Sequence, residues 1–431
     1  MNSDEIIFGD CLRRLRIGAG LTQEALAERA GLSVDSIASL ERGRRRAPRP
    51  DTLRRLTLAI GPSGADRVAL IGAATTSSAT ASLDLKGPGR LPAPAGSLIG
   101  RRPDLAAVIK LLRGGESRLV TLTGPGGVGK TRLAIAAAAA VESDHAEGAA
   151  FVSLAELRHA DAVLPAIARA LGVRSGRQPV LDRLRAYLGD RDLVLLLDTF
   201  EHLLPAGPLI ANLIAACPAM LVLATSRAAL GLRGEQRFVV PPLDLPPPGD
   251  CAPGVLAGYP AVGLFVARAR AAGQDFRIQN QARADAVTEI CRRLDGLPLP
   301  IEFAAIRAAA LGPIVLAERL EDSLDALGEG ARDLPDRQRS LRASFNWTYG
   351  LLPAHARALL ARMAVVSDGG NAKSIEAVCG PGGLDALEVL VDFNLVQVSD
   401  GTGGRRFAML GTTCEYAREQ AGSRGGFLAA G

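Results

Sequence analysis

The segment TLTGPGGVGKTRLA, at residues 121–134, decides the fold of the middle of this 431-residue chain. Residues 124–131 match the pattern G-x-x-x-x-G-K-[ST] in full, and they lie between an apolar run, RLVTLT, and a helix-forming run, TRLAIAAAAA. A glycine-rich loop between a strand and a helix is the arrangement that holds the phosphates of a nucleotide. The complete motif in this context favours nucleotide binding over a glycine-rich turn without a ligand.

The chemistry of this loop follows from its residue types. Gly126, Gly127 and Gly129 allow backbone N–H groups to point into one concavity, and the start of the helix adds its partial positive charge. We expect Lys130 to reach the β- and γ-phosphates of ATP or ADP, and the Thr131 hydroxyl to coordinate Mg²⁺. The predicted nucleotide-binding residues of the loop are Gly124, Pro125, Gly126, Gly127, Val128, Gly129, Lys130, Thr131 and Arg132.

Further aliphatic runs, AAFVSL, LVLLLDT and MLVLATSR, alternate with helical stretches, which predicts an α/β domain with a parallel sheet. LVLLLDT ends at Asp198, where ligands bind in such sheets, so Asp198 is predicted to hold Mg²⁺ rather than to start a surface turn. Arg227 follows the next strand and either contacts the γ-phosphate or is solvated. Many P-loop proteins that hydrolyse nucleotides have a second acidic residue directly after the metal-binding aspartate, and here that position is Thr199. This difference favours a slow ATPase over a motor or kinase. Glu201 is a weak candidate to orient water.

The N-terminal segment LTQEALAERAGLSVDSIASLERGRRRAPRP, at residues 21–50, carries a second signal. Thr22 is a good helix N-cap, Gly31 can take the left-handed conformation that ends a helix, and Ile37 and Leu40 fill a core. With these residues at this spacing, residues 6–60 resemble the XRE-type (lambda repressor-like) helix-turn-helix DNA-binding domain. A helical adaptor that docks a protein is the alternative.

The resemblance to this domain implies that its second helix enters the major groove of double-stranded DNA. The predicted DNA-contacting residues are Gln23, Ser33, Val34, Asp35, Ser36, Ser39, Arg42, Arg44, Arg45 and Arg46. Gln23 and the arginines would hold phosphates, while the serines, the valine and the aspartate lie at the groove. This face lacks the Arg, Asn or Gln that make bidentate base contacts, so one copy is expected to bind with moderate affinity.

Five segments in order carry a family resemblance across residues 98–420. They are LIGRRPDL (98–105), GPGGVGKTRLA (124–134), LLLDTFEHLL (195–204), TSRAALGLRGEQRFVVPPL (225–243) and CRRLDGLPLPIEFAA (291–305). Together they resemble the NB-ARC class of signal-transduction (STAND) ATPases. The resemblance implies that Ile99, Gly100 and Arg101 lie on the adenine side, that Arg227 senses the γ-phosphate and that Pro298 lies over the nucleotide. The last segment resembles the winged-helix domain of bacterial members.

The expected architecture is multidomain. It comprises an all-α helix-turn-helix domain at 1–72, a Pro/Gly-rich linker at 73–97, a P-loop NTPase domain at 98–245, a helical domain with the GLPL motif at 246–335, a winged-helix domain at 336–420 and a tail at 421–431.

Composition limits the cellular context and the partners. The net charge of +5 permits an acidic partner, and the six cysteines form no CxxC or Cys/His cluster, which argues against a zinc site. No apolar run reaches the roughly 18 residues of a membrane helix, and no signal peptide is visible, so we expect a cytoplasmic protein.

The favoured hypothesis is an ATP/ADP-switched transcriptional regulator that binds DNA and oligomerises with itself. Its sensor is either absent or provided by another chain. The alternative is a signalling or defence ATPase whose N-terminal module docks a protein.

Overall fold

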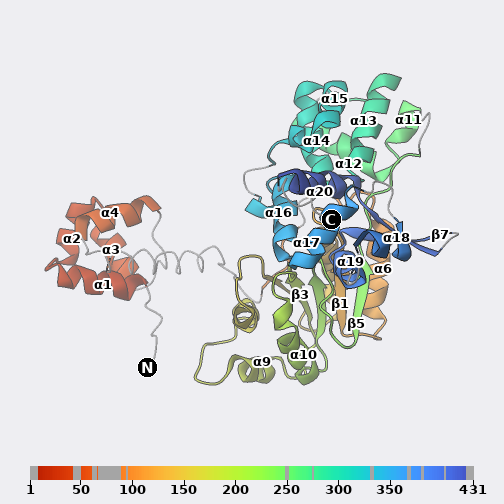
Figure 1. The fold of residues 1–431 in the computed structure, drawn as a ribbon. Coiled ribbons are helices and arrows are strands. Elements are labelled where there is room, and N and C mark those ends of the chain that lie inside the picture. The colour runs from red at the N-terminus through yellow and green to blue at the C-terminus, as the bar shows by residue number, and fades with distance from the viewer. Residues whose placement is uncertain are drawn as a thin grey trace. The chain divides into compact units, whose positions relative to one another are not determined.

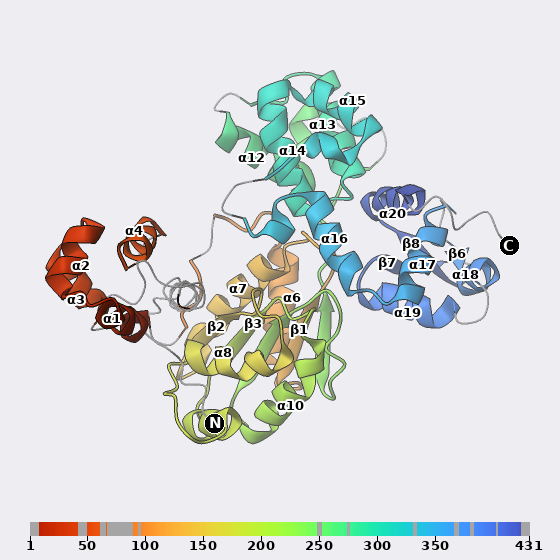
Figure 2. The same ribbon diagram turned by 60° about the vertical axis from the view of Figure 1, so that its left-hand side comes forward.

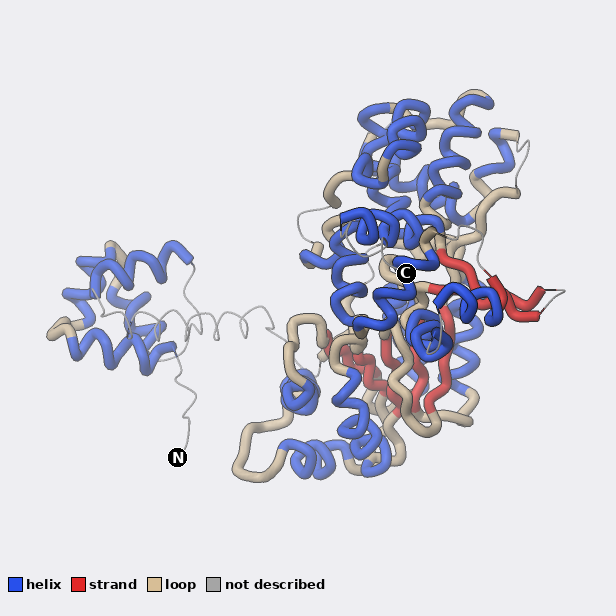
Figure 3. Tube along the Cα trace, in the orientation of Figure 1, coloured by secondary structure: helices blue, strands red, loops and turns tan. Residues whose placement is uncertain are grey.

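The computed structural model describes residues 8–41, 50–60, 66, 89–93, 96–247, 252–273, 276–330, 334–365, 370–379, 383–401 and 404–423. The chain divides into two compact units, Met1–Lys86 and Gly87–Gly431 (Figure 1). Helices dominate both units, and the strands gather in the second (Figure 3).

The described residues of the first unit form four helices: α1 (Phe8–Gly18), α2 (Gln23–Ala30), α3 (Val34–Glu41) and α4 (Pro50–Ile60). The Thr22 hydroxyl caps α2 by accepting from the backbone N–H of Ala25, and Gly31 ends the helix with φ of 59°. Gly31 is required there because side chains with a Cβ rarely adopt this conformation. Leu26, Ile37 and Leu56 are fully buried between the helices. The predicted caps and core of this segment therefore agree with the structure.

The second unit begins with a five-stranded sheet in the order β2-β3-β4-β1-β5, in which every neighbouring pair is parallel. Its strands are β1 (Leu119–Thr123), β2 (Ala149–Ser153), β3 (Val194–Asp198), β4 (Leu221–Thr225) and β5 (Glu235–Val239). The predicted α/β domain with a parallel sheet is confirmed. Strand β5 adds an edge that the apolar runs do not predict, because its residues are mostly half-exposed.

Helices cover both faces of this sheet because successive residues of a strand point to opposite sides. Val194 and Leu196 of β3 pack in one core, with α6 (Arg102–Arg113) and α7 (Lys130–Val141). Leu195 and Leu197 pack in the other core. That second core includes α8 (Val163–Ala170), α9 (Val180–Leu188) and α10 (Gly207–Ala216). Three short 3₁₀ turns lie in the connections: η1 (Glu142–Asp144), η2 (Ala160–Ala162) and η3 (Leu204–Ala206).

A bundle of helices follows the sheet. It contains α11 (Pro253–Leu256), α12 (Pro260–Ala272), α13 (Gln281–Arg293), α14 (Pro298–Leu311), α15 (Pro313–Asp322), η4 (Leu324–Leu327) and η5 (Asp336–Gln338). Proline at the first turn starts α12, α14 and α15, where its missing N–H costs nothing. Phe265, Ile301 and Leu316 are fully buried in one core, which gives the bundle a hydrophobic interior of its own.

The last part of the chain combines helices with a small antiparallel sheet in the order β6-β8-β7. Its elements are α16 (Leu341–Leu351), α17 (Ala354–Met363), β6 (Gly370–Asn371), α18 (Ala372–Cys379), α19 (Gly383–Asp392), β7 (Val396–Gly401), β8 (Gly404–Met409) and α20 (Gly411–Ser423). Strands β7 and β8 pair antiparallel, from Val396 opposite Met409 to Gly401 opposite Gly404. In both ribbon views α16 lies between the large sheet and the bundle α12–α15 (Figure 1, Figure 2).

Asp295 joins the helical bundle to the last helix. Its carboxylate accepts from the backbone N–H groups of Gly411 (2.9 Å) and Thr412 (2.8 Å) and from the Thr412 hydroxyl (2.6 Å). These are the donors that the start of α20 would otherwise leave unpaired. Burial raises the pKa of Asp295, although the bonds from Thr412 and Gly411 oppose that shift.

Among the helices of the described residues, none has both the length and the apolar character that crossing a membrane requires.

Candidate functional site

The loop between β1 and α7 is shaped for a ligand without side chains in the way. Gly127 and Gly129 have φ of 79° and 98°, a region that favours glycine. A Cβ at Gly126 would lie 2.8 Å from Nη1 of Arg227 and closer still to the Ser344 hydroxyl, and one at Gly127 would lie 3.0 Å from the Cβ of Leu299. Glycine therefore keeps open the concavity at the N-terminus of α7, and the loop fits the phosphates of a nucleotide.

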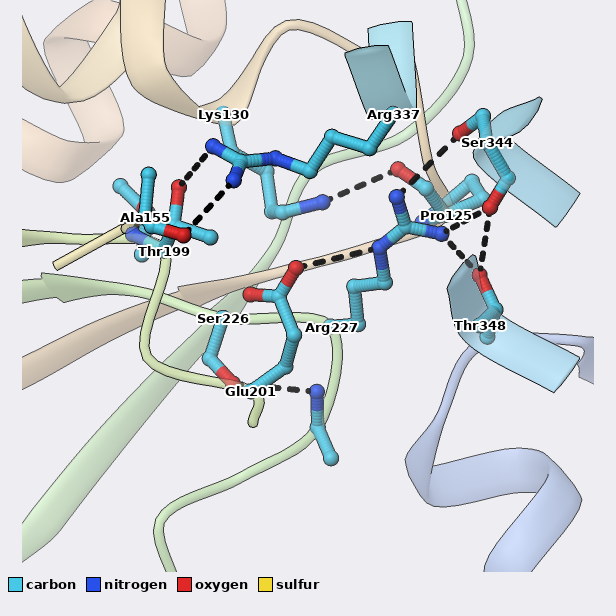
Figure 4. Close-up of polar contacts among 12 residues, drawn as sticks. Pro125, Lys130, Ala155, Thr199, Glu201, Ser226, Arg227, Arg337, Ser344 and Thr348 are labelled. Atoms are coloured by element: carbon cyan, nitrogen blue, oxygen red, sulfur yellow. Dashed lines mark hydrogen bonds and ion pairs between the residues drawn. The ribbon is translucent and has the colours of Figure 1, made fainter. Parts of the chain in front are cut away.

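Lys130, the first residue of α7, turns back over this loop. Its Nζ donates to the backbone oxygen of Gly124 at 2.8 Å. It also donates to the backbone oxygen of Pro125 at 3.0 Å (Figure 4). Burial, together with the nearby Arg227, lowers the pKa of Lys130 to about 8. The fold thus places Lys130 at the phosphate loop in surroundings that disfavour its positive charge. An anionic ligand bound there would stabilise that charge.

Asp198, at the carboxyl end of β3, is surrounded by hydroxyl groups. Its Oδ1 accepts from Thr131 (2.6 Å) and Thr225 (2.7 Å), and its Oδ2 accepts from Thr199 (3.0 Å). The two residues predicted to hold Mg²⁺, Thr131 and Asp198, are therefore in direct contact. A carboxylate and a hydroxyl are oxygen ligands of the kind that Mg²⁺ takes, so this pair fits the ion.

Thr199 adopts a strained backbone conformation beside this carboxylate. Its φ is 67°, which is unfavourable for a β-branched residue. Its N–H donates to the Thr225 hydroxyl at 2.9 Å, which ties the end of β3 to the end of β4. Strain of this kind costs about 1–3 kcal/mol and is typical of ligand-binding and switch regions.

Arg227 extends from the end of β4 into a fully protein-lined environment. Its side chain is 6% exposed and that of Glu201 is 5% exposed; Nε of Arg227 and Oε1 of Glu201 are 3.2 Å apart. The guanidinium also donates to the Ser344 carbonyl (3.0 Å), the Ser344 hydroxyl (3.2 Å) and the Thr348 hydroxyl of α16 (Figure 4). Arg227 therefore links the sheet to the C-terminal helices, and most of its N–H donors are spent on protein groups.

The buried ion pair of Arg227 and Glu201 affects the pKa of both partners. Burial alone would raise the pKa of Glu201, but Arg227 and Lys130 together lower it below its usual value. Burial lowers the pKa of Arg227, and Glu201 opposes that shift. An ion pair buried in this way is costly to break, because either partner alone would be an uncompensated charge.

Helix α14 closes the other side of the loop. The N–H of Leu299 donates to the Gly127 carbonyl at 3.1 Å, and Pro298 lines the same cavity, of about 150 Å³, as Lys130 and Thr131. Arg132 lines this cavity too, and its Nη1 is 3.3 Å from the Glu302 carboxylate of α14. The predicted residues Pro298 and Arg132 thus meet the phosphate loop in one place.

The residues predicted for the adenine side lie outside this cavity. The Arg101 guanidinium donates to the carbonyls of Val128 (2.9 Å) and Pro241 (2.7 Å), so it braces the phosphate loop from the protein side. Gly100, with φ of 70°, lies against Pro260, and Ile99 packs on the core of the helical bundle. Their contact with a nucleotide remains a prediction.

The predicted DNA face of the first unit is only partly described. Val34 and Ser33 are exposed, whereas Ser36 and Ser39 are half-buried, and the Ser33 hydroxyl caps α3 by accepting from the Ser36 N–H at 3.2 Å. Gln23 donates its amide to Glu41 at 2.7 Å, so that side chain is held within the domain. The side chain of Asp35 and all of Arg42, Arg44, Arg45 and Arg46 lie outside the described residues.

Several residues near the loop were not predicted from the sequence for this site, and among them are Thr225, Ser344, Thr348 and Arg337. Thr225 could have been found, because it ends a strand of a sheet whose strand ends carry ligands. Ser344, Thr348 and Arg337 come from a segment more than 100 residues beyond Arg227, and no local pattern connects that segment to the phosphate loop.

Two protein-family models match the chain: a helix-turn-helix domain over residues 7–70 and an AAA domain over residues 113–234. The "Putative HTH-type transcriptional regulator Rv0890c" of Mycobacterium tuberculosis is 40% identical over 319 residues, 72% of this chain and 34% of that protein. Regulatory protein AfsR of Streptomyces coelicolor is 29% identical over 368 residues, 79% of this chain and 34% of that protein. The chain thus spans about a third of the length of these two relatives.

Another relative matches over most of its own length. The uncharacterized protein Rv0894 of Mycobacterium tuberculosis is 36% identical over 339 residues, 76% of this chain and 82% of that protein. Among solved structures, a STAND protein with a tetratricopeptide repeat sensor from Pyrococcus horikoshii overlaps 78% of this chain and 44% of that chain at 13% identity, with a TM-score of 0.31. The chain carries a helix-turn-helix domain and an AAA domain, and it belongs to the same family as the uncharacterized protein Rv0894.

Proposed function

We propose that this protein is a transcriptional regulator whose binding to double-stranded DNA is switched by ATP and ADP. The observation that carries the proposal is the position of Arg227. This arginine lies beside the phosphate loop, and at the same time its guanidinium holds Ser344 and Thr348 of α16. A nucleotide at the loop and the C-terminal helices therefore compete for the donors of one side chain.

The switch follows from that competition. A ligand shifts a conformational equilibrium only by as much as its affinity differs between the two states. Bound nucleotide with Mg²⁺ would supply negative phosphate oxygens and a divalent cation, with Lys130, Thr131 and Asp198 as the residues that hold them. A γ-phosphate that draws Arg227 away from α16 favours release of the C-terminal helices, whereas ADP leaves the contacts of Arg227 in place.

The finer assignments belong to this proposal. The sheet, the bundle with Pro298 and the C-terminal elements act as the nucleotide-binding, helical and winged-helix domains of an NB-ARC (STAND) ATPase, with the boundaries expected above. Released C-terminal helices allow copies of the chain to oligomerise, and slow ATP hydrolysis resets the switch. The protein works in the cytoplasm, and another chain can provide the sensor.

Oligomerisation matters for the DNA-binding side. Val34 and Ser33 at the start of α3 are exposed, as a recognition helix requires, but they offer no bidentate base contact. A single domain then binds weakly. Pairing two of them raises the apparent affinity through effective concentration, without any new contact to DNA. The nucleotide state can therefore control DNA binding without touching the DNA-binding surface.

The competing function is a signalling ATPase whose first unit docks a protein, and DNA affinity measured against salt separates the two. For the full chain with a non-hydrolysable ATP analogue, we expect affinity to fall steeply between 50 and 200 mM salt because released counterions drive phosphate contacts. Changing Arg44, Arg45 and Arg46 together to Ala should weaken binding. It should also reduce the slope of log affinity against log salt concentration by about the amount that three phosphate contacts contribute. Affinity that is insensitive to salt and to these arginines would favour the protein-docking function.

A further inference from the structure

We propose that Arg337 is a second arginine of the phosphate site, a nucleotide-binding residue that the segment ahead of α16 contributes and that acts on the terminal phosphate of a bound triphosphate. This inference rests on the proposed function. Arg337 lies in η5 and lines the same cavity as Lys130, Thr131 and Arg227. A guanidinium in that wall is well suited to a phosphate, because its planar donors match two phosphate oxygens at once.

The contacts of Arg337 leave its charge available. Its Nη1 donates to the Ala155 carbonyl at 3.2 Å, and its Nη2 donates to the Thr199 hydroxyl at 3.4 Å (Figure 4). Among the residues that the structure describes, both hydrogen-bond acceptors of Arg337 are neutral oxygens, and Glu201 is already paired with Arg227. Both hydrogen bonds are long, so a charged phosphate oxygen would replace them with a gain in free energy.

The contact with Thr199 indicates which phosphate Arg337 serves. Thr199 directly follows Asp198, and its hydroxyl also donates to that carboxylate. In P-loop NTPases the metal ion held by this carboxylate bridges the β- and γ-phosphate oxygens, so a residue next to the carboxylate lies close to the terminal phosphates. A cation placed there stabilises the charge of a γ-phosphate more than that of a β-phosphate, because the Coulomb energy falls with distance.

Arg227 and Arg337 each reach across the boundary between the sheet and the C-terminal segment, in opposite directions. Arg227 comes from the sheet and binds α16, whereas Arg337 comes from the segment ahead of α16 and binds the ends of β2 and β3 through Ala155 and Thr199. A triphosphate that attracts both guanidinium groups therefore pulls on the sheet and on the C-terminal segment together. Arg337 would give that segment its own means of detecting the nucleotide.

Trp347 provides a direct optical readout. It is the single tryptophan of the sequence, and the Arg337 guanidinium carbon lies 5.6 Å from its ring centre, within range of a cation–π interaction. The His202 ring contacts Trp347 edge-on, with 5.3 Å between ring centres. A movement of Arg337 toward a bound phosphate changes the surroundings of this indole, so tryptophan emission should change when the nucleotide binds.

The test is titration of the full chain with adenylyl imidodiphosphate or ADP, each with Mg²⁺, followed by calorimetry and by Trp347 emission. Arg337→Ala should weaken adenylyl imidodiphosphate about tenfold and ADP clearly less, and it should remove most of the nucleotide-dependent change in emission. Arg337→Lys keeps the charge but not the planar fork, so its affinity for adenylyl imidodiphosphate should lie between that of Arg337→Ala and that of the wild type.

Arg339→Ala is the matched control, because Arg339 lies two residues after Arg337, is exposed and pairs with Asp336. This variant should bind both nucleotides as the wild type does. Wild-type affinity of Arg337→Ala for adenylyl imidodiphosphate, or equal losses for the two nucleotides, would overturn the inference while leaving the proposed function intact. A wild-type chain that binds neither nucleotide would overturn both.

Discussion

Lys130→Ala will lower the affinity of the chain for ADP and ATP by roughly 100-fold or more. Lys130 is the first cation of α7 and lies over the carbonyls of Gly124 and Pro125. Hydrogen bonds to charged groups contribute about 1.5–3 kcal/mol each, and the ammonium group can donate more than one to the phosphates. Isothermal titration calorimetry with each nucleotide measures the loss directly.

Removing Lys130 should not unfold the nucleotide-free protein. Because the fold lowers the pKa of Lys130 to about 8, holding its charge at pH 7 costs more free energy in the folded chain than in the unfolded one. The unfolded chain binds more protons than the folded one between pH 8 and the ordinary lysine pKa, so the contribution of Lys130 to stability rises with pH across that window. The thermal midpoint at pH 7 should therefore equal that of the wild type or exceed it.

Lys110→Ala supplies the control for that experiment, since Lys110 is exposed on α6. It removes the same side chain and charge without touching the phosphate loop, and it should leave both nucleotide affinities unchanged. A Lys130→Ala protein that binds ADP and ATP as tightly as the wild type would contradict the assignment of this loop.

Arg227→Ala is the substitution with the largest expected effect on stability. It leaves the Glu201 carboxylate, which is 5% exposed, without its cation, and it removes the donors that hold Ser344 and Thr348. Breaking one side of a buried ion pair costs about 3–5 kcal/mol of unfolding free energy. Urea unfolding followed by Trp347 emission measures the effect, since this indole lies on α16.

Two further variants show whether the ion pair is the cause. Changing Glu201 to Gln in the Arg227→Ala background removes both charges, and it should recover part of the lost stability, as a double-mutant cycle would measure. Arg233→Ala removes an exposed arginine six residues further along and should change stability by no more than about 0.5 kcal/mol. If Arg227→Ala unfolds at the same urea concentration as the wild type, this arginine does not tie α16 to the sheet.

Local patterns predict much of this molecule because their physical causes are local. Thr22 and Gly31 begin and end a helix through their own backbone geometry, and the strand before residues 124–131 and the helix after them follow from a continuous motif. The alternation of apolar strands with helices requires a parallel sheet, which the order β2-β3-β4-β1-β5 displays. The proximity of Thr131 to Asp198 follows from the same topology, because both lie at the carboxyl end of that sheet.

The remainder depends on distant contacts that no local pattern encodes. Strand β5 is a half-exposed edge, so its residues lack the apolar signal of the central strands. Arg337 contacts Thr199, which lies 138 residues earlier in the chain, and Arg227 contacts Thr348, which lies 121 residues later. Such pairs are fixed by how the helical bundle returns α16 to the sheet, and the sequence around either residue gives no sign of its partner.

The most direct test of the nucleotide switch is selection of genomic DNA fragments by the purified full chain in two states, one with ADP and one with a non-hydrolysable ATP analogue. We expect enrichment of one DNA motif in the ATP-analogue arm and much weaker enrichment in the ADP arm. Equal enrichment in both arms, with each nucleotide shown to be bound, would contradict the claim that the phosphate site controls DNA binding.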